Sequence, residues 1–201
     1  MTEIKSALEL ALERTKGIQG DKKTIQSNDL KNDGKRLASA YLATTNSTDE
    51  KAVALKIKAM SGDEKAWFKE GFFSVMVANL TLPSAEGFEA QAKQLEAGLT
   101  IVIKDRKQVS YIFQQVSQFF TQYLQSRDQL EEAVKQQYEP KLRQKEQQLE
   151  QQMGSKVKLT HEQDQEYLSM LAKNYSQLEE QYNQALLQVK EQLKQIFDSA
   201  K

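Results

Sequence analysis

The sequence predicts an all-α protein in which a helical head packs on the base of a long antiparallel coiled-coil hairpin. The main observation is periodic: apolar residues recur every three or four positions over residues 109–153 and again over residues 160–197. A Gly-Ser break at 154–155 separates these two stretches. Two long helices joined by a few residues fold back on each other as a hairpin.

Composition supports an elongated shape. Only 39% of the 201 residues are apolar, below the roughly 45–50% of ordinary globular domains, so each helix is expected to bury a stripe. We place the head, with four to five helices, at residues 1–104. The hairpin is expected at residues 105–201, with its turn near residues 154–159.

In the head, we expect helices over residues 3–16, 28–43, 49–60 and 64–82, with a polar loop over residues 17–28. Thr2 and Thr48 are N-cap candidates. The helix over residues 64–82 is apolar on most of its circumference and should be the centre of the head. Pro83 then stops it, and Ser84 caps the next helix.

From Ser84 onward, one continuous helix is predicted to run from the head into the hairpin. A heptad pattern extends from Leu95 to Tyr123, with Arg106 as its only polar member. The β-branched run 99–103 resembles a strand, but the heptads on both sides favour a helix. Gly98 is the weak point, since a glycine inside a helix costs about 1 kcal/mol.

A broad apolar stripe marks the start of the outgoing hairpin helix. It is wider than the seam of a two-stranded coiled coil, so it needs a second partner, either the head helices or another subunit. We predict it as an interaction surface and as the contact of a homodimer. Its members are Tyr111, Ile112, Phe113, Val116, Phe119, Phe120, Tyr123 and Leu124.

Within the hairpin, Pro140 is a predicted hinge. An interior proline removes a backbone hydrogen bond and costs about 3 kcal/mol, so we expect a kink or a break near residues 138–139. A turn centred near residue 157 pairs positions whose numbers sum to about 314. The returning helix should start at a capping box formed by Thr160 and Gln163.

Charge and cysteine content exclude several functions. The chain has 28 basic and 28 acidic residues, without the basic excess that nucleic acid or anionic lipid requires. The absence of cysteine excludes disulfides and thiolate chemistry. The chain shows no secretory pattern and no 18-residue apolar run, so we expect a cytoplasmic protein without direct membrane insertion.

No catalytic, cofactor or metal site is predicted. His161, the only histidine, is expected to be exposed at a helix N-terminus, since one histidine without cysteine cannot build the usual metal sets. The pairs Glu131-Glu132 and Glu179-Glu180 are expected on solvated helix faces. The 22 glutamines between residues 108 and 195 are interpreted as helix-forming outer positions, although such a bias is also found in aggregation-prone segments.

The opening run, residues 3–15 (EIKSALELALERT), resembles the start of an uncharacterised bacterial family of unknown function. Its members are soluble helical proteins of about this length, associated with spirochaetes. The resemblance implies a helical bacterial protein and brings no activity, cofactor or site residue.

These observations favour a non-enzymatic structural or interaction protein whose projecting hairpin is a docking arm or spacer. One alternative is a cytoplasmic holdase that grips clients with the aromatic residues of its hairpin. Another is a peripheral stalk component of a membrane-associated machine.

Overall fold

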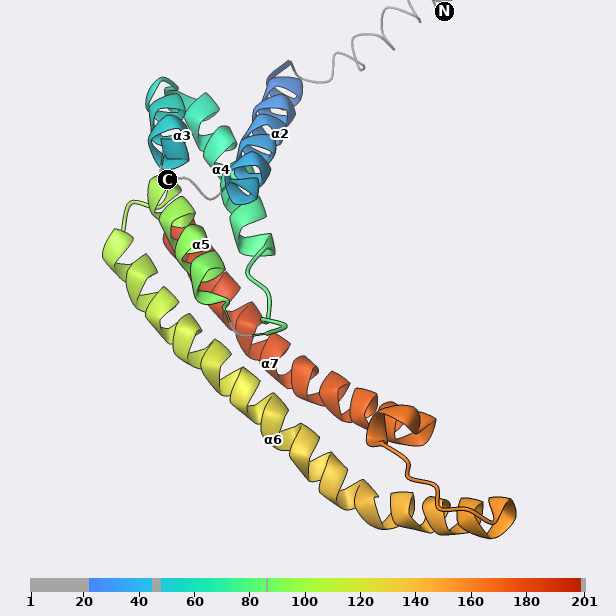
Figure 1. Ribbon diagram of the computed structural model, residues 1–201. Coiled ribbons are helices and arrows are strands. Elements are labelled where there is room, and N and C mark those ends of the chain that lie inside the picture. The colour runs from blue at the N-terminus through green and yellow to red at the C-terminus, as the bar shows by residue number, and fades with distance from the viewer. Residues whose placement is uncertain (1–21, 45–47, 86, 200–201) are drawn as a thin grey trace, which may run out of the picture.

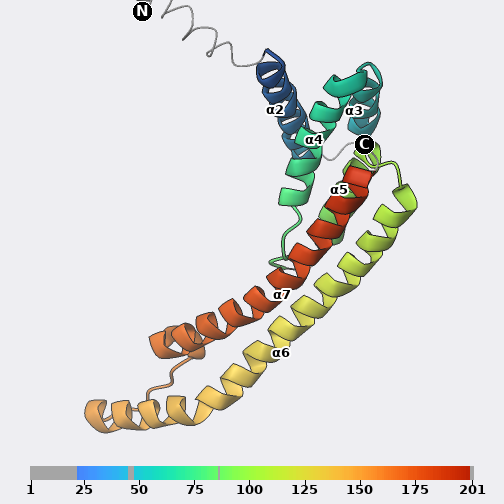
Figure 2. The same ribbon diagram turned by 180° about the vertical axis from the view of Figure 1, so that it is seen from behind.

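The computed structural model describes residues 22–44, 48–85 and 87–199, and every regular element in these ranges is helical, which confirms the all-α prediction (Figures 1 and 2). The predicted helix over residues 3–16 and its Thr2 cap lie outside these ranges. The elements are α2 (Lys22–Ala43), α3 (Thr48–Lys58), α4 (Gly62–Ala78), α5 (Glu89–Val102), α6 (Arg106–Met153), the short 3-10 turn η1 (His161–Gln163) and α7 (Gln165–Ser199).

The centre of the head is a close pair of parallel helices, α2 and α4. The residue numbers of contacting pairs increase together along both helices, from Lys23 with Asp63 to Lys31 with Glu70. Two glycines permit the approach. A Cβ atom on Gly34 would lie 2.2 Å from the Phe68 carbonyl oxygen, and one on Gly71 would lie 2.0 Å from the Lys31 carbonyl oxygen. Gly34 is unfavourable for α2 by helix propensity alone. The close contact with α4 explains its presence, because a larger residue would not fit there.

Several predicted boundaries in the head were wrong. The polar residues 22–27 were predicted as loop, yet they form the first turns of α2. The helix predicted to reach Leu82 ends at Ala78, and the following helix starts at Glu89 rather than at Ser84. Leu80 explains the early end of α4, because this side chain is 1% exposed and packs into the core from the connecting segment.

The continuous helix predicted from Ser84 into the hairpin was also wrong, because the chain reverses at residues 103–105. Ile103 adopts an extended conformation, and the Asp105 side chain caps α6 by accepting a 3.0 Å hydrogen bond from the Gln108 backbone N–H. Helix α5 therefore lies antiparallel to α6 (Figure 1). The polar position in the heptad, Arg106, marks the first residue of a new helix.

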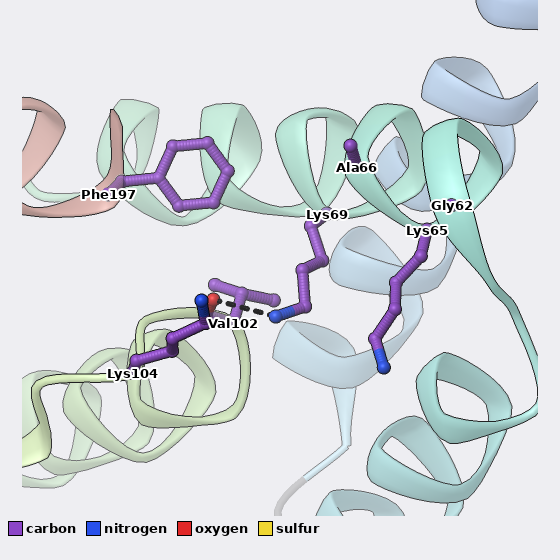
Figure 3. A pocket seen from close by; sticks show the side chains of 7 residues that line it. All are labelled: Gly62, Lys65, Ala66, Lys69, Val102, Lys104 and Phe197. Atoms are coloured by element: carbon purple, nitrogen blue, oxygen red, sulfur yellow. Dashed lines mark hydrogen bonds between the residues drawn. The ribbon is translucent and has the colours of Figure 1, made fainter. Parts of the chain in front are cut away.

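One apolar core extends across the predicted boundary at residue 104. It joins Phe68, Phe72 and Met76 of α4 to Leu99 of α5, and it includes residues of α2, α3, α6 and α7. The C-terminal end of α7 lies against α4 and the α5–α6 turn (Figure 3). The Phe197 ring stacks there on Phe73, with ring centroids 4.3 Å apart. The base of the hairpin is therefore part of the head core.

Beyond the head, α6 and α7 project as an antiparallel arm (Figures 1 and 2). At a rise of 1.5 Å per residue, the 48 residues of α6 are about 70 Å long. The arms are not matched, since α7 has 35 residues. The returning segment 154–160 is largely extended, and an extended chain covers more than twice the length of a helix for each residue.

This asymmetry shifts the register of the hairpin from the predicted one. Contacting pairs across the arm have numbers that sum to between 300, for Glu139 with His161, and 311, for Lys145 with Glu166, instead of 314. The predicted sum placed the centre of the turn near residue 157 and did not allow for how far the extended segment returns along α6.

Helix α6 continues through Pro140 without a break. Its ribbon changes direction in the stretch where the colour turns from yellow to orange, near residue 140 (Figures 1 and 2). Pro140 therefore lies inside one bent helix and does not open a new one.

Candidate functional site

The predicted interaction stripe, residues 111–124, lies at the base of the arm and is mostly covered within the chain. Phe120 packs edge-on against Phe88 of the head, and Phe119 and Tyr123 both contact Tyr182 of α7. Five members are buried: Ile112, Phe113, Val116, Phe120 and Tyr123. Phe119 and Leu124 are half-buried, and Tyr111 is 60% exposed.

The width of the stripe is thus explained by two neighbours within one chain. The head packs on one side of the stripe and α7 packs on the other. Of the two partners that the sequence left open, the head helices are therefore the one observed. For a second subunit, the stripe offers Tyr111 and the edges of two half-buried side chains.

The middle of the arm is held by tyrosine hydroxyls. The Tyr175 hydroxyl donates a 2.7 Å hydrogen bond to Glu131, and the hydroxyls of Ser126 and Tyr182 lie 2.9 Å apart. Burial, and then the hydrogen bond to Glu131, raises the pKa of Tyr175 to about 12. Glu131 therefore differs from the solvated carboxylate that the sequence suggested, because it fixes the register of α7 on α6.

The far end of the arm has a small apolar core of its own. Val134, Tyr138 and Leu142 of α6 pack with Tyr167 of α7, and Leu159 of the returning segment packs against this cluster. The Leu159 backbone N–H also donates a 2.8 Å hydrogen bond to Glu146. The tip is consequently a packed structure, separate from the head core.

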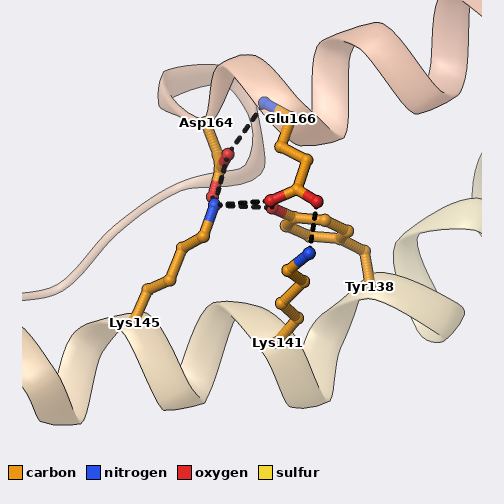
Figure 4. A network of polar contacts seen from close by, with 5 residues as sticks. All are labelled: Tyr138, Lys141, Lys145, Asp164 and Glu166. Carbon is orange, nitrogen blue, oxygen red and sulfur yellow. Dashed lines mark hydrogen bonds and ion pairs between the residues drawn. The ribbon is translucent and has the colours of Figure 1, made fainter.

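An ion-pair network closes this tip core (Figure 4). The Lys145 ammonium lies 2.7 and 2.9 Å from the two Asp164 oxygens and donates a 2.8 Å hydrogen bond to the Tyr138 hydroxyl. Glu166 contacts Lys145 at 3.2 Å and also pairs with Lys141. The lysines come from one face of α6, and the acids come from the start of α7.

Asp164 is the central residue of the network. Its side chain is only 7% exposed, and it caps α7 by accepting a 3.0 Å hydrogen bond from the Glu166 backbone N–H. The Lys145 hydrogen bond holds the pKa of Asp164 at about 2, below its usual 3.8. Contact with Lys141, and then Lys145, also lowers the pKa of Glu166, while Asp164 raises the pKa of Lys145.

The predicted capping box of Thr160 and Gln163 forms, but the helix α7 begins after it, at Gln165. The Thr160 backbone N–H donates a 3.1 Å hydrogen bond to the Gln163 side chain, and the segment makes a single 3-10 turn. His161 in this turn is 21% exposed instead of fully exposed. It packs edge-on against Tyr167 and lies 3.4 Å from Glu139.

Sequence reasoning missed the tip network because its members lie about 20 residues apart and on opposite sides of the turn. Lys141 and Lys145 are four residues apart on one helix face, and Asp164 and Glu166 follow the capping box. This spacing places each pair near one helix face, but only the observed register brings the two pairs together.

The charged groups at the tip are engaged with one another. Each acid of the network is paired with a lysine, and no group of three or more metal-ligating side chains occurs within residues 22–44, 48–85 and 87–199. Two large apolar side chains are exposed at the tip among polar ones such as Gln151 and Lys156: Met153 is 66% exposed at the end of α6, and Leu168 is 36% exposed in the first turn of α7.

Comparison with known proteins gives one match. Residues 54–195, most of the chain, match the model of a family of unknown function, DUF6657. The chain belongs to this family. The match agrees with the expected uncharacterised family, but it shows no link to spirochaetes and does not include residues 3–15, which carried that resemblance. No curated protein and no solved structure matches the chain.

The DUF6657 match covers most of the head core and nearly the whole arm, so both belong to the family's shared unit. Among the described helices, none is long and apolar enough to cross a membrane.

Proposed function

We propose that this protein is a non-enzymatic interaction protein whose projecting arm is a docking element, with the contact at the tip. The observation that carries the proposal is the separate tip core closed by Lys145, Asp164 and Glu166. A passive spacer needs two paired helices, whereas this arm also anchors the returning segment through the Leu159 side chain and backbone.

Holding that segment has a cost in conformational entropy, about 1–2 kcal/mol for each residue whose backbone is fixed. A preorganised tip lowers the cost of binding, because the partner does not have to order it. Met153 and Leu168 then supply the apolar side chains that a small docking contact needs.

The sequence pointed to the base of the arm and to a homodimer. That expectation rested on the stripe at residues 111–124, whose members are mostly buried within one chain, so the proposal moves the contact to the tip and does not include the dimer.

The holdase alternative has weaker support. It relied on adaptable aromatic side chains along the hairpin, yet Tyr123, Tyr138 and Tyr167 are all buried. The stalk alternative requires a membrane-associated partner, and no described residue favours one over a soluble partner.

Position-specific crosslinking tests the docking arm. A photoreactive phenylalanine analogue is placed at Met153 of the full chain in cells, and at Leu55 of α3 as a matched control, since these side chains are 66% and 65% exposed. We expect a discrete crosslinked partner from position 153 that is absent from position 55.

A second variant tests whether crosslinking of the partner depends on the ordered tip. Lys145→Met leaves Asp164 without its closest cation and should abolish the crosslink from position 153. Identical captures from both positions, or an unchanged capture with Lys145→Met, would contradict the proposal.

A further inference from the structure

A second feature lies at the opposite end of the molecule from the tip. A pocket of about 280 Å³ opens where α4, the α5–α6 turn and the end of α7 meet (Figure 3). Three of its lining side chains are lysines and none is acidic. The lining residues are Gly62, Lys65, Ala66, Lys69, Val102, Lys104 and Phe197.

The lysines come from two elements. Lys65 and Lys69 lie one turn apart on the same face of α4, and Lys104 comes from the turn between α5 and α6. Figure 3 shows Lys69 and Lys104 reaching toward one another near the Val102 carbonyl, with Lys65 beside Lys69. None of the three forms a salt bridge with a carboxylate of the described residues.

Among the described residues, no carboxylate therefore forms an ion pair with these three lysines. The acids in the first turn of α4 are engaged on the other side, with Asp63 paired to Lys23 and Glu64 accepting a hydrogen bond from Gln26, both of α2. Burial lowers the pKa of Lys69, and the like charges of Lys65 and Lys104 lower it further.

A structural role accounts for only one of these lysines. The Lys69 ammonium donates a 3.1 Å hydrogen bond to the Val102 carbonyl oxygen, and it thereby caps the C-terminus of α5. Lys65 and Lys104 have no such bond. They place like charge beside the Lys69 ammonium, and a bound anion would offset that repulsion.

The pocket also has a fixed apolar wall. Phe197 is 5% exposed and is held in place by its stacking on Phe73. At about 30 Å³ for each water-sized group, the pocket accommodates an anionic group together with a short apolar substituent.

We propose that this pocket binds a small organic phosphate, with the phosphate between Lys65, Lys69 and Lys104 and the apolar group against Phe197. A phosphate monoester carries nearly two negative charges at neutral pH, so it matches three ammonium groups better than a single carboxylate does. Lysine is a common phosphate ligand because it acts as a point charge.

Calorimetric titration of the full chain at constant ionic strength tests the proposal, with phenyl phosphate as the probe. Inorganic phosphate lacks the ring, and phenol lacks the charge. We expect phenyl phosphate to bind at least tenfold more tightly than either one. Equal affinity for inorganic phosphate would overturn the organic part of the proposal, and no measurable binding of phenyl phosphate would overturn the site.

Charge-neutralising variants locate the site. Lys65→Gln with Lys104→Gln should weaken the binding of phenyl phosphate at least tenfold, while the fold persists because neither side chain makes a hydrogen bond or ion pair within the described residues. Lys93→Gln, on the exposed face of α5, is the matched control and should leave the affinity unchanged. An unchanged affinity in the double variant, or an equal loss in the control, would refute the assignment.

A pelleting assay separates a soluble phosphate from a lipid headgroup. With vesicles that contain phosphatidic acid, the chain should stay in the supernatant, because the ligand must enter a pocket between helices. Pelleting that is lost in the double lysine variant would assign the site to a lipid phosphate and overturn the soluble ligand.

Discussion

At the residue scale, the Tyr167 hydroxyl is a buried polar group that has no hydrogen-bond partner among the residues that the structure describes. A hydroxyl in this state costs about 1–3 kcal/mol. We therefore expect Tyr167→Phe to raise the free energy of unfolding by about 1 kcal/mol. Chemical denaturation followed by circular dichroism measures the change.

Tyr138→Phe is the matched control in the same core. The Tyr138 hydroxyl accepts a 2.8 Å hydrogen bond from Lys145, so its removal should lower the free energy of unfolding by about 1 kcal/mol. Changes of the same sign in both variants would contradict the difference between the two hydroxyls.

Glycines of the head give a second pair of variants with different expected costs. In Gly71→Ala, the new Cβ atom would lie 2.0 Å from the Lys31 carbonyl oxygen, so the α2–α4 pair must separate. In Gly98→Ala, the nearest atoms are at 2.9–3.0 Å and belong to the side chains of Met76 and Tyr41, which have more freedom to move.

We expect Gly71→Ala to lower the free energy of unfolding by about 3 kcal/mol. Gly98→Ala should cost less than half of that, because the atoms it meets belong to side chains that can move, whereas Gly71→Ala meets backbone. The gain of about 1 kcal/mol in helix propensity is the same at both positions. Thermal unfolding of both variants measures the difference, and a larger loss for Gly98→Ala would show that the α2–α4 contact is not the tighter one.

At the element scale, the stability of the arm should fall in acid through Asp164. Its folded pKa of about 2 is below its ordinary 3.8, so the carboxylate stabilises the fold above about pH 4, and this contribution is lost as the pH falls toward 2. The lowered pKa of Glu166 acts in the same direction.

We expect Asp164→Asn to lower the melting temperature at pH 7 and to flatten its decline between about pH 4 and 2. Asp128→Asn on the exposed face of α6 is the control and should leave both unchanged. The melting temperature measured against pH distinguishes them, and parallel profiles for wild type and Asp164→Asn would rule out this role of Asp164.

The helices also show how much of the fold could be predicted from the sequence. Periodicity identified α6 and α7 because apolar residues recur along one face of each helix. It did not reveal the reversal at residues 103–105, because a heptad pattern looks the same whether the chain continues or folds back with the same face inward. The tip network was missed for a related reason, since its charged pairs depend on a register set by an extended segment.

At the scale of the whole molecule, the shared core argues that the arm and the head fold together. The predicted boundary at residue 104 cuts through this core, which joins Leu99 of α5 to Val109 and Phe113 of α6 and to Leu193 of α7. Removal of the head would expose the apolar base of the hairpin to water, at a cost of about 25 cal/mol for each Å².

A fragment of residues 105–201 tests this argument. We expect it to self-associate through the exposed stripe at residues 111–124, whereas the intact chain covers that stripe with its own head. Light scattering measures the mass of both forms at equal concentration. In the fragment, Phe113→Ser with Phe120→Ser should restore a monomer, because these two side chains lose their head contacts when the head is removed. A monomeric, fully helical fragment without these substitutions would instead establish the hairpin as an independent domain.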